Sequence, residues 1–167
     1  MKQIHLTNGY TTTVDDVDYD SLSVHKWYAH VKRRRDGSVR AVYAARSITL
    51  CNGRETTVRM HRVIMRPSET QYIDHIDSDG LNNCRSNLRL CTPSENVRNS
   101  RRSCNETSKY KGVCWDSRDK KWRAQISFSK KCYKLGLFDI ETDAAKAYDA
   151  AAIRSFGEFA RVNTYDG

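Results

Sequence analysis

The chain has 167 residues, enough for one ordinary domain or for two small ones with modest cores. It carries 29 Lys and Arg against 20 Asp and Glu, a formal net charge of +9, which favours a polyanionic partner and places nucleic acid first. Its apolar runs fall well short of the roughly 18 residues of a membrane span, and its first ten residues lack the apolar core of a signal peptide. We therefore expect a cytoplasmic protein without a membrane partner.

Residues 1–60 contain short runs rich in Val, Tyr, Thr and Ile, which are typical of β-strands. Three turn dipeptides separate these runs: Asn8-Gly9, Asp36-Gly37 and Asn52-Gly53. Such dipeptides are the strongest short-range signals of a β-hairpin, because their residues tolerate a positive φ. The segment is predicted to form a small antiparallel β region.

Three consecutive arginines, Arg33, Arg34 and Arg35, directly precede the Asp36-Gly37 turn. A hairpin tip with this charge can contact the DNA backbone, because phosphate contacts require only well-placed cations. A solvated tip with no partner explains the same charge equally well, so both interpretations stay open. We include the three arginines among the candidate DNA-binding residues.

Residues 61–100 change character, with a short apolar segment, a polar loop, a strand at 87–91 and then a helix. The helix start is well marked, because Thr92 can cap it, Pro93 suits its first position and Glu95 completes a capping box. Residues 98–109 are polar and basic without periodicity, as a linker near nucleic acid would be. The predicted organisation is a β region and site-bearing domain at 1–100, a basic linker at 101–109 and a second domain at 110–167.

The second domain is predicted to hold three strands, near 110–115, 121–128 and 132–138, followed by one helix from Thr142 to Gly157. In the middle strand, alternation gives one apolar face that can pack on the helix. The opposite face carries Lys121, Arg123, Gln125 and Ser127. This face can read bases in the major groove, although an ordinary solvated sheet face would show the same alternation.

The chain has six cysteines, none of which falls in a C-x-x-C pair. This spacing does not spell out a zinc knuckle or a thioredoxin-like motif. We expect reduced, mostly structural thiols.

An apolar strand end runs directly into Asp74 and His75, and an Asn-rich loop follows. Neutral His can accept a proton near pH 7, whereas carboxylate and amide oxygens suit Mg²⁺ or Mn²⁺, so the pair points to metal-assisted phosphodiester hydrolysis. An EF-hand frame would place His75 and Ser86 at ligand positions that require acids, which argues against a calcium loop. Asp77 and Asp79 are interpreted as residues that shape the loop. His61 is a further candidate, for which a structural role is preferred.

Residues 59–99 resemble the HNH, or ββα-metal, nuclease motif of phage homing endonucleases, through the series M-H-R, D-H-x-D, N-N-x-x-x-N-L-R and T-x-x-x-N. The resemblance implies one divalent ion, Mg²⁺ or Mn²⁺, bound by Asp74 and by Asn96, which replaces the more common final His. It further implies that His75 is the general base and that Asn87 orients the His75 imidazole.

Residues 108–163 resemble the AP2 domain of plant transcription factors and phage HNH enzymes, through the segments Y-K-G-V, W-x-A-x-I, L-G-x-F and A-A-x-A-Y-D-x-A-A. The resemblance implies that one side of the sheet faces DNA. We add Lys121 to the candidate DNA-binding residues, because it lies on the same polar face of its strand. The positions that the resemblance assigns to that side are Lys111, Arg123, Gln125, Ser127, Cys132 and Lys134. Cys114, Ser127, Cys132 and Lys134 depart from the plant pattern, so the plant target sequence is not carried over.

The fold class expected is α+β: an N-terminal antiparallel β region, a ββα-metal HNH motif, then a three-stranded antiparallel sheet with one helix. The expected function is a monomeric, phage-encoded homing-type endonuclease that nicks double-stranded DNA at a preferred site in the cytoplasm of a bacterial host. The alternative is an AP2-type DNA-binding regulator with an inactive HNH scaffold. An RNA binder is disfavoured, because no row of stacking aromatics is expected on the sheet.

Overall fold

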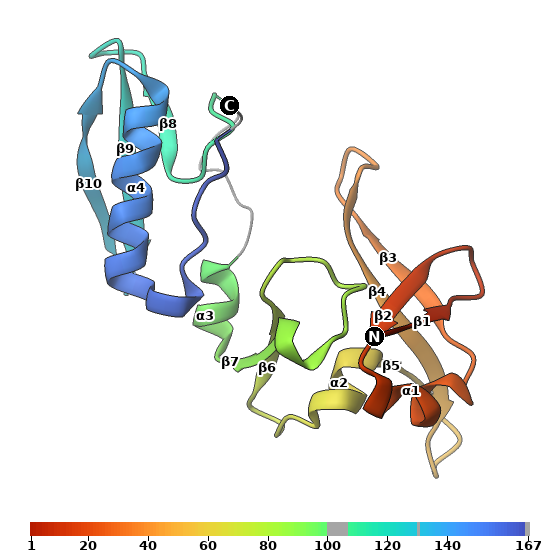
Figure 1. Ribbon diagram of the computed structural model, residues 1–167. Coiled ribbons are helices and arrows are strands. Elements are labelled where there is room, and N and C mark those ends of the chain that lie inside the picture. The colour runs from red at the N-terminus through yellow and green to blue at the C-terminus, as the bar shows by residue number, and fades with distance from the viewer. Residues whose placement is uncertain (100–106, 130, 166–167) are drawn as a thin grey trace. The chain divides into compact units, whose positions relative to one another are not determined.

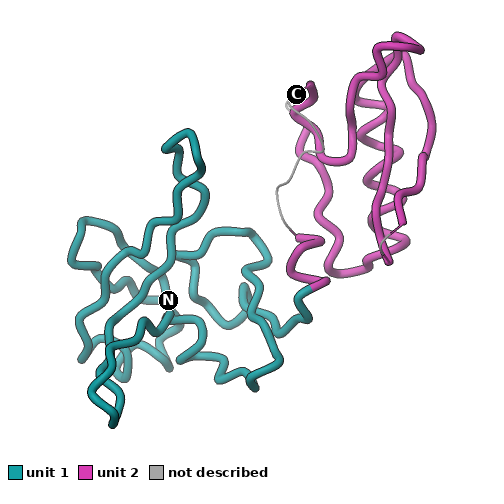
Figure 2. Tube along the Cα trace, turned by 180° about the vertical axis from the view of Figure 1, so that it is seen from behind, with its two compact units in different colours: residues 1–93 teal, residues 94–167 magenta. Residues whose placement is uncertain are grey.

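The computed structural model describes residues 1–99, 107–129 and 131–165. The chain forms two compact units, residues 1–93 and 94–167 (Figure 2). Both units combine small antiparallel sheets with a few helices, so the mixed α and β composition is confirmed. Residues 101–106 of the expected linker lie outside the described residues, and the division into 1–100, 101–109 and 110–167 stays a prediction.

The first unit begins with two antiparallel sheets (Figure 1). The two-stranded sheet pairs β1 (Lys2–His5) with β2 (Thr11–Val14), and the three-stranded sheet has the order β3 (Tyr28–Arg33), β4 (Val39–Thr49), β5 (Glu55–Arg59). The strands of each hairpin are neighbours in sequence, as expected of an antiparallel meander.

The three predicted hairpin turns are confirmed. Gly9, Gly37 and Gly53 have φ values of 84°, 83° and 77°, and each lies between two paired strands. A side chain at these positions would strain the backbone, so glycine is required by conformation rather than by space.

The remainder of the first unit supplies the strands that carry the candidate site. Helix α2 (Met60–Met65) follows β5, and a hairpin then pairs β6 (Tyr72–His75) with β7 (Leu88–Cys91). The long loop between β6 and β7 ends in a 3-10 turn at Arg85–Asn87.

One hydrophobic core joins the elements of the first unit. Trp27 is almost fully buried, and its indole nitrogen donates a hydrogen bond to the Leu22 carbonyl at 2.8 Å. Val14, Met60 and Leu88 belong to the same cluster, so β2, α2 and β7 share this core. The site-bearing hairpin is therefore fixed by apolar packing as well as by its own strand pairing.

Two helices of the first unit differ from the sequence expectation. Helix α1 (Asp16–Ser23) lies inside the region predicted to be β, and α2 forms where only an apolar segment was expected. In α1 only Asp18 and Leu22 are buried, so the helix presents no apolar stripe of helical period. Helix α2 has six residues, too few to display a period at all.

The second unit packs one helix on a three-stranded sheet. Short helix α3 (Pro93–Arg98) precedes the sheet, which has the order β10 (Lys131–Phe138), β9 (Lys121–Phe128), β8 (Val113–Asp116). Helix α4 (Glu141–Phe156) lies along one face of this sheet and ends at a 3-10 turn, Gly157–Phe159 (Figure 1).

Small residues allow the close packing of α4 on the sheet, as the sequence predicted. Ala144, Ala145 and Ala152 are fully buried against the face of β9 that carries Ala124 and Ile126. At Gly112, an added Cβ would lie 1.9 Å from the Tyr148 ring, so this glycine lets β8 approach the helix.

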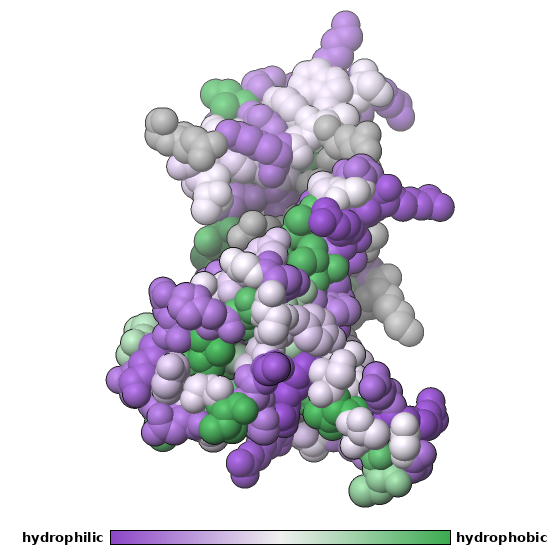
Figure 3. All heavy atoms as spheres, turned by 90° about the vertical axis from the view of Figure 1, so that its right-hand side faces the viewer, coloured by the Kyte–Doolittle hydropathy of each residue, from purple (hydrophilic) through white to green (hydrophobic). Residues whose placement is uncertain are grey.

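The structure also bears on the membrane and thiol expectations. No helix among the described residues is long and apolar enough to cross a membrane. On the face seen in Figure 3, hydrophobic residues form small separate patches among hydrophilic ones. The described cysteines are free thiols, at positions 51, 84, 91, 114 and 132, whereas Cys104 lies outside the described residues.

Candidate active site

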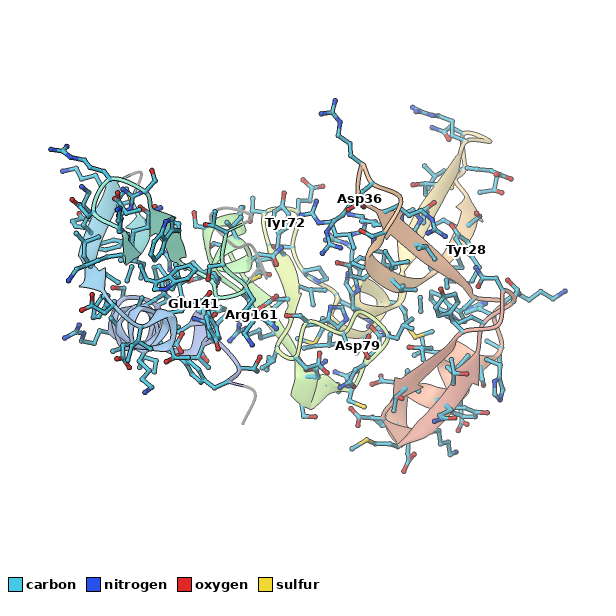
Figure 4. All side chains as sticks on the ribbon, turned by 90° about the horizontal axis from the view of Figure 1, so that it is seen from above. Tyr28, Asp36, Tyr72, Asp79, Glu141 and Arg161 are labelled. Atoms are coloured by element: carbon cyan, nitrogen blue, oxygen red, sulfur yellow. The ribbon has the colours of Figure 1, made fainter. Side chains whose placement is uncertain are left out.

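The β6–β7 hairpin positions the predicted Asp-His pair. Asp74 lies opposite Arg89 and His75 lies opposite Leu88 in the antiparallel register. Figure 4 labels Tyr72, where β6 begins, and Asp79, in the loop that follows the strand. Asp74 and His75 are each 6% exposed, which is unusual for polar side chains and requires that both be compensated.

Asp74 is compensated by an arginine from the partner strand. Its Oδ2 accepts hydrogen bonds from Arg89 Nε at 3.0 Å and from Arg89 Nη2 at 2.8 Å. The Arg89 side chain is itself only 13% exposed, so this ion pair is screened little by solvent. Arg89 was absent from the predicted site residues, although its place in the N-L-R segment put it opposite Asp74.

The β6–β7 hairpin offers few candidate metal ligands. Across residues 1–99, 107–129 and 131–165, no group of three or more His, Cys, Asp or Glu could hold a metal. Mg²⁺ in phosphoryl-transfer sites takes only one or two carboxylates and completes its shell with water and substrate phosphate oxygens. The single buried carboxylate of Asp74 is compatible with that mode.

His75 is held by an asparagine that sequence analysis had not singled out. Its Nε2 lies 3.4 Å from Oδ1 of Asn83, which is fully buried. The Asn83 amide nitrogen donates to Thr12 Oγ1 at 2.8 Å, and this bond assigns Oδ1 as the atom that faces the imidazole. The Asn82-Asn83 dipeptide in the loop was the signal available in the sequence.

The environment of His75 favours its neutral form. Burial lowers the pKa of His75, whereas Asn83 and the carboxylates of Asp77, Asp74 and Asp79 oppose that shift. Because an amide oxygen only accepts, Nε2 carries the hydrogen in this arrangement and the ring lone pair belongs to Nδ1. A neutral imidazole of this kind has the chemistry of a general base.

Two further rings surround His75. The centroid of the His61 ring lies 5.0 Å from that of His75, with the rings edge to face, and the Tyr43 centroid lies 6.0 Å from His75. Burial, with smaller effects of His75, Arg59 and Arg62, lowers the pKa of His61 to about 3. His61 is therefore a neutral, buried neighbour of His75, and whether its role is only structural stays open.

The loop between β6 and β7 is shaped by its own acids, as the sequence predicted. Asp77 Oδ1 accepts a hydrogen bond from the Asp79 amide at 2.8 Å, and Asp79 Oδ1 accepts one from the Leu81 amide at 3.0 Å. Burial acts to raise the pKa of Asp77, but hydrogen bonds from the Asp79 amide and from the side chains of Asn82 and Asn87 bring that pKa below its usual value. These local bonds hold Ser78 at a φ of 64°.

Asn87 bonds to the same loop. Its Nδ2 donates to Asp77 Oδ1 and to the Asn82 carbonyl, both at 2.9 Å, while its Oδ1 accepts from the Asp77 amide at 3.1 Å. The Asn87 carbonyl also accepts from the Ile76 amide. Asn87 thus fixes the segment just after His75, and its predicted effect on the imidazole itself stays a prediction.

Asn96 lies in α3, within the second unit, and is half-buried. The two predicted metal ligands therefore belong to different units of the chain. That Asn96 joins Asp74 at one ion stays a prediction.

The polar face of β9 has the composition that the sequence predicted. Arg123 Nη1 is paired with Asp116 Oδ2 at 3.0 Å, and Lys121 Nζ with Asp139 Oδ1 at 3.1 Å. Lys134 is exposed and, with Arg123, lines an open hollow of about 300 Å³. Gln125 is half-buried, and Ser127 and Cys132 are exposed.

Lys111 has a different environment from the other predicted DNA-binding residues. Its ammonium donates a hydrogen bond to the carbonyl of Arg98, where α3 ends. Burial, with the charge of Arg161, lowers the pKa of Lys111 to about 8. Its contact with DNA stays a prediction, and its observed contact is with the protein's own backbone.

Among the hairpin-tip arginines, two fold back on their own turn. Arg33 donates to the Gly37 carbonyl at 3.0 Å, and Arg34 donates to Ser38 Oγ at 3.1 Å. Arg35 is exposed beside Asp36, which Figure 4 labels at the tip.

Comparison with known proteins finds similarity to the AP2 domain and to an HNH endonuclease. Residues 108–158 match the AP2 domain. The chain is 38% identical over 95 residues to an uncharacterized HNH endonuclease of Acanthamoeba polyphaga mimivirus, a match that covers 57% of this chain and 48% of that protein. It is 34% identical over 90 residues to protein 3.8 of Escherichia phage T7, which covers 54% of this chain and 74% of that protein. The chain belongs to the phage-related HNH endonuclease family with a C-terminal AP2 domain.

A third relative matches over 72 residues. The AP2-like ethylene-responsive transcription factor TOE2 of Arabidopsis thaliana is 39% identical there, over 42% of this chain and 15% of that factor. The chain spans about half the length of the mimivirus relative, and no solved structure was found to match it. An AP2 domain together with nuclease relatives indicates DNA binding by this member of the family.

Proposed function

We propose that this protein is a metal-dependent HNH endonuclease that hydrolyses DNA phosphodiester bonds. The observation that carries the proposal is the buried His75, neutral and aligned by Asn83, directly beside the carboxylate of Asp74. A phosphodiesterase needs a base for its attacking water and a ligand for a hard cation, and both are adjacent here.

In this proposal the water that attacks phosphorus gives its proton to Nδ1 of His75. The hydrogen on Nε2 stays hydrogen-bonded to Asn83 Oδ1, so the ring is held in the tautomer whose Nδ1 can accept that proton. Asn87 and Asp77 hold the segment after His75 in place while the imidazole becomes charged.

One divalent ion, Mg²⁺ or Mn²⁺, would polarise the scissile phosphate and stabilise the leaving 3′ oxygen. Asp74 and Asn96 are the residues that would hold it, each through an oxygen atom of the kind these cations prefer. Arg89, which donates two hydrogen bonds to Asp74 Oδ2, would hold that carboxylate in position.

The AP2 domain would hold the DNA duplex so that the HNH unit cuts at a preferred site. Its proposed contacts are Lys111, Lys121, Arg123, Gln125, Ser127 and Lys134, with Arg33, Arg34 and Arg35 of the β3–β4 hairpin adding backbone contacts. One active site cuts one strand, so we propose a homing-type enzyme that acts as a monomer and nicks DNA. It would act in the cytoplasm of a phage-infected bacterium.

The direct experiment is incubation of supercoiled phage DNA with the purified protein, with Mg²⁺, with Mn²⁺ or with EDTA, followed by separation of nicked and linear products. Nicked circles that form with either metal and disappear with EDTA support the proposal. Linear product that forms from the start of the reaction would mean that the protein cleaves both strands rather than nicking one.

One observation favours a second candidate, a DNA-binding regulator with an inactive HNH scaffold. Arg89 already neutralises Asp74, so the proposed metal ligand is engaged by a protein cation. The same experiment separates the candidates, because tight DNA binding without cleavage in any divalent metal would favour the regulator.

A further inference from the structure

Two cations lie over one tyrosine ring on the sheet of the first unit. Lys32 Nζ is 5.7 Å from the centroid of the Tyr43 ring, and Arg59 Cζ is 5.0 Å from it. Tyr43 is in β4, and the two cations come from the strands on either side, β3 and β5. Three neighbouring strands therefore present an aromatic ring flanked by two positive charges.

The same ring contacts the candidate active site. Its centroid is 5.8 Å from that of His61 and 6.0 Å from that of His75. The loop after β6 also packs closely against the Tyr43 ring, because a Cβ at Gly80 would lie 2.6 Å from Tyr43 Cδ1. Tyr43 thus links the cations to the residue proposed as the general base.

The charge on this face is not compensated within the unit. Lys32 has its pKa lowered by burial and by the like charges of Arg59 and Arg40. In the part of the chain that the structure describes, neither Lys32 nor Arg59 forms an ion pair with a carboxylate. Clustered cations that repel one another and form no ion pair with a carboxylate favour an anion from outside.

We propose that Lys32 and Arg59, placed over Tyr43, bind a phosphate of the DNA strand to be cut and hold it beside His75. The proposal rests on the proposed nuclease function and adds the residues that position its substrate. The guanidinium fork of Arg59 can bind two phosphate oxygens at once, whereas the Lys32 ammonium acts as a point charge. Figure 4 labels Tyr28, where β3 begins, and Asp36, in the turn between β3 and β4.

These two cations differ from the arginines at the hairpin tip. Arg33 and Arg34 donate hydrogen bonds to their own turn, which leaves them fewer donors for DNA. Lys32 and Arg59 instead lie over the ring of Tyr43, and that ring lies beside His75 in the candidate active site. Their location therefore favours a role in positioning one phosphate for hydrolysis over a role in the general attraction of DNA.

The test compares Lys32→Gln and Arg59→Gln with the control Arg54→Gln, which removes an exposed charge from the β4–β5 turn of the same sheet. Each substitution is made in the otherwise intact protein and in the His75→Ala background. Two quantities are measured. The first is the rate of nicking of supercoiled DNA at saturating protein, and the second is the DNA affinity at salt concentrations from about 50 to about 200 mM. Thermal unfolding of each variant establishes that it folds.

Removing either cation should reduce the slope of log affinity against log salt by a part of the roughly 0.9 that one neutralised phosphate contributes, and removing both should reduce it by about 0.9 in total. Nicking at saturation should fall by about tenfold or more, since a charge-assisted contact to the reacting phosphate is lost. Arg54→Gln should change neither quantity as much, and Arg59→Lys should keep the salt slope while losing part of the nicking rate.

The salt slope is informative even if no cleavage is ever found, so the two proposals can fail separately. An unchanged slope and unchanged nicking in both Gln variants would overturn the phosphate site and leave the nuclease intact. A reduced slope in a protein that never cuts would support the phosphate site and contradict the nuclease. Equal losses in Arg54→Gln would also overturn the inference, because they would show only a general effect of charge.

Discussion

Buried polar residues account for most of the site, and each is held by a specific neighbour. Asn83 and Thr12 are fully buried and bonded to each other, and Asn83 reaches His75. The Asp-His pair could be found in the sequence because its residues are adjacent. The sequence did not single out Asn83 and Tyr43, and it gave His61 only as a further candidate, because their contacts with His75 depend on packing between elements, which local sequence does not encode.

Gly80 is required for space rather than for conformation. Its added Cβ would lie 2.2 Å from the Val42 carbonyl oxygen, a backbone atom that cannot move aside. Gly80→Ala should therefore destabilise the protein by about 1 to 3 kcal/mol through overpacking. Gly37→Ala is the control, because open space surrounds it and only its φ of 83° is strained. Chemical unfolding measures both, and a Gly80→Ala variant as stable as the wild type would contradict the close approach of the loop to β4.

Two ion pairs of equal length are expected to differ in their contribution to stability. Arg89–Asp74 and Arg85–Asp18 both have N to O distances of 2.8 Å, but the Arg89 side chain is 13% exposed and that of Arg85 is 50% exposed. Arg89→Met should cost about 3 to 5 kcal/mol, because it removes a buried cationic partner from a buried carboxylate. Arg85→Met should cost less, about 1 to 3 kcal/mol, because Asp18 is also buried but its half-exposed arginine is screened by solvent. Equal losses in urea unfolding would mean that Asp74 does not depend on Arg89.

At the scale of elements, predictions were most successful where local signals are strong. The three glycine turns, strand β9 and the Ala-rich helix α4 follow from turn chemistry, alternation and capping. Helix α1 was missed because tertiary packing of Leu22 stabilises a sequence with little amphipathic pattern. Short elements of this kind are stabilised by tertiary packing, and their own sequences contain little signal that predicts them.

The polar face of β9 is the element on which DNA recognition is proposed to depend. Asp116 holds Arg123 through one guanidinium nitrogen, which orients the side chain on the sheet. Arg123→Ala should weaken specific binding by about 1 to 3 kcal/mol and relax the choice of target. Lys146→Ala removes an exposed charge from α4 and should leave target choice unchanged. Selection of bound sites from a random DNA pool measures both, and identical site preferences in wild type and Arg123→Ala would remove Arg123 from the reading face.

At the scale of the whole molecule, the chain divides its chemistry between two compact units. The Asp-His pair lies in residues 1–93, whereas the AP2 domain and Asn96 lie in residues 94–167. In the proposed function, a cut at a preferred site would require both units on the same DNA, one to bind the sequence and one to hydrolyse it. The composition predicted a polyanionic partner, but only the site residues distinguish an enzyme from a DNA-binding protein without activity.

The most direct test of the central claim is the comparison of His75→Ala with His25→Ala, an exposed histidine of the same unit. Nicking of supercoiled DNA and DNA affinity are measured for both variants in the same metal buffer. The account predicts that His75→Ala loses nicking while its DNA affinity stays near that of the wild type, because a general base adds little to substrate binding, and that His25→Ala keeps both. Full nicking by His75→Ala, or loss of its DNA affinity in parallel with nicking, would contradict the assignment of His75 as the base.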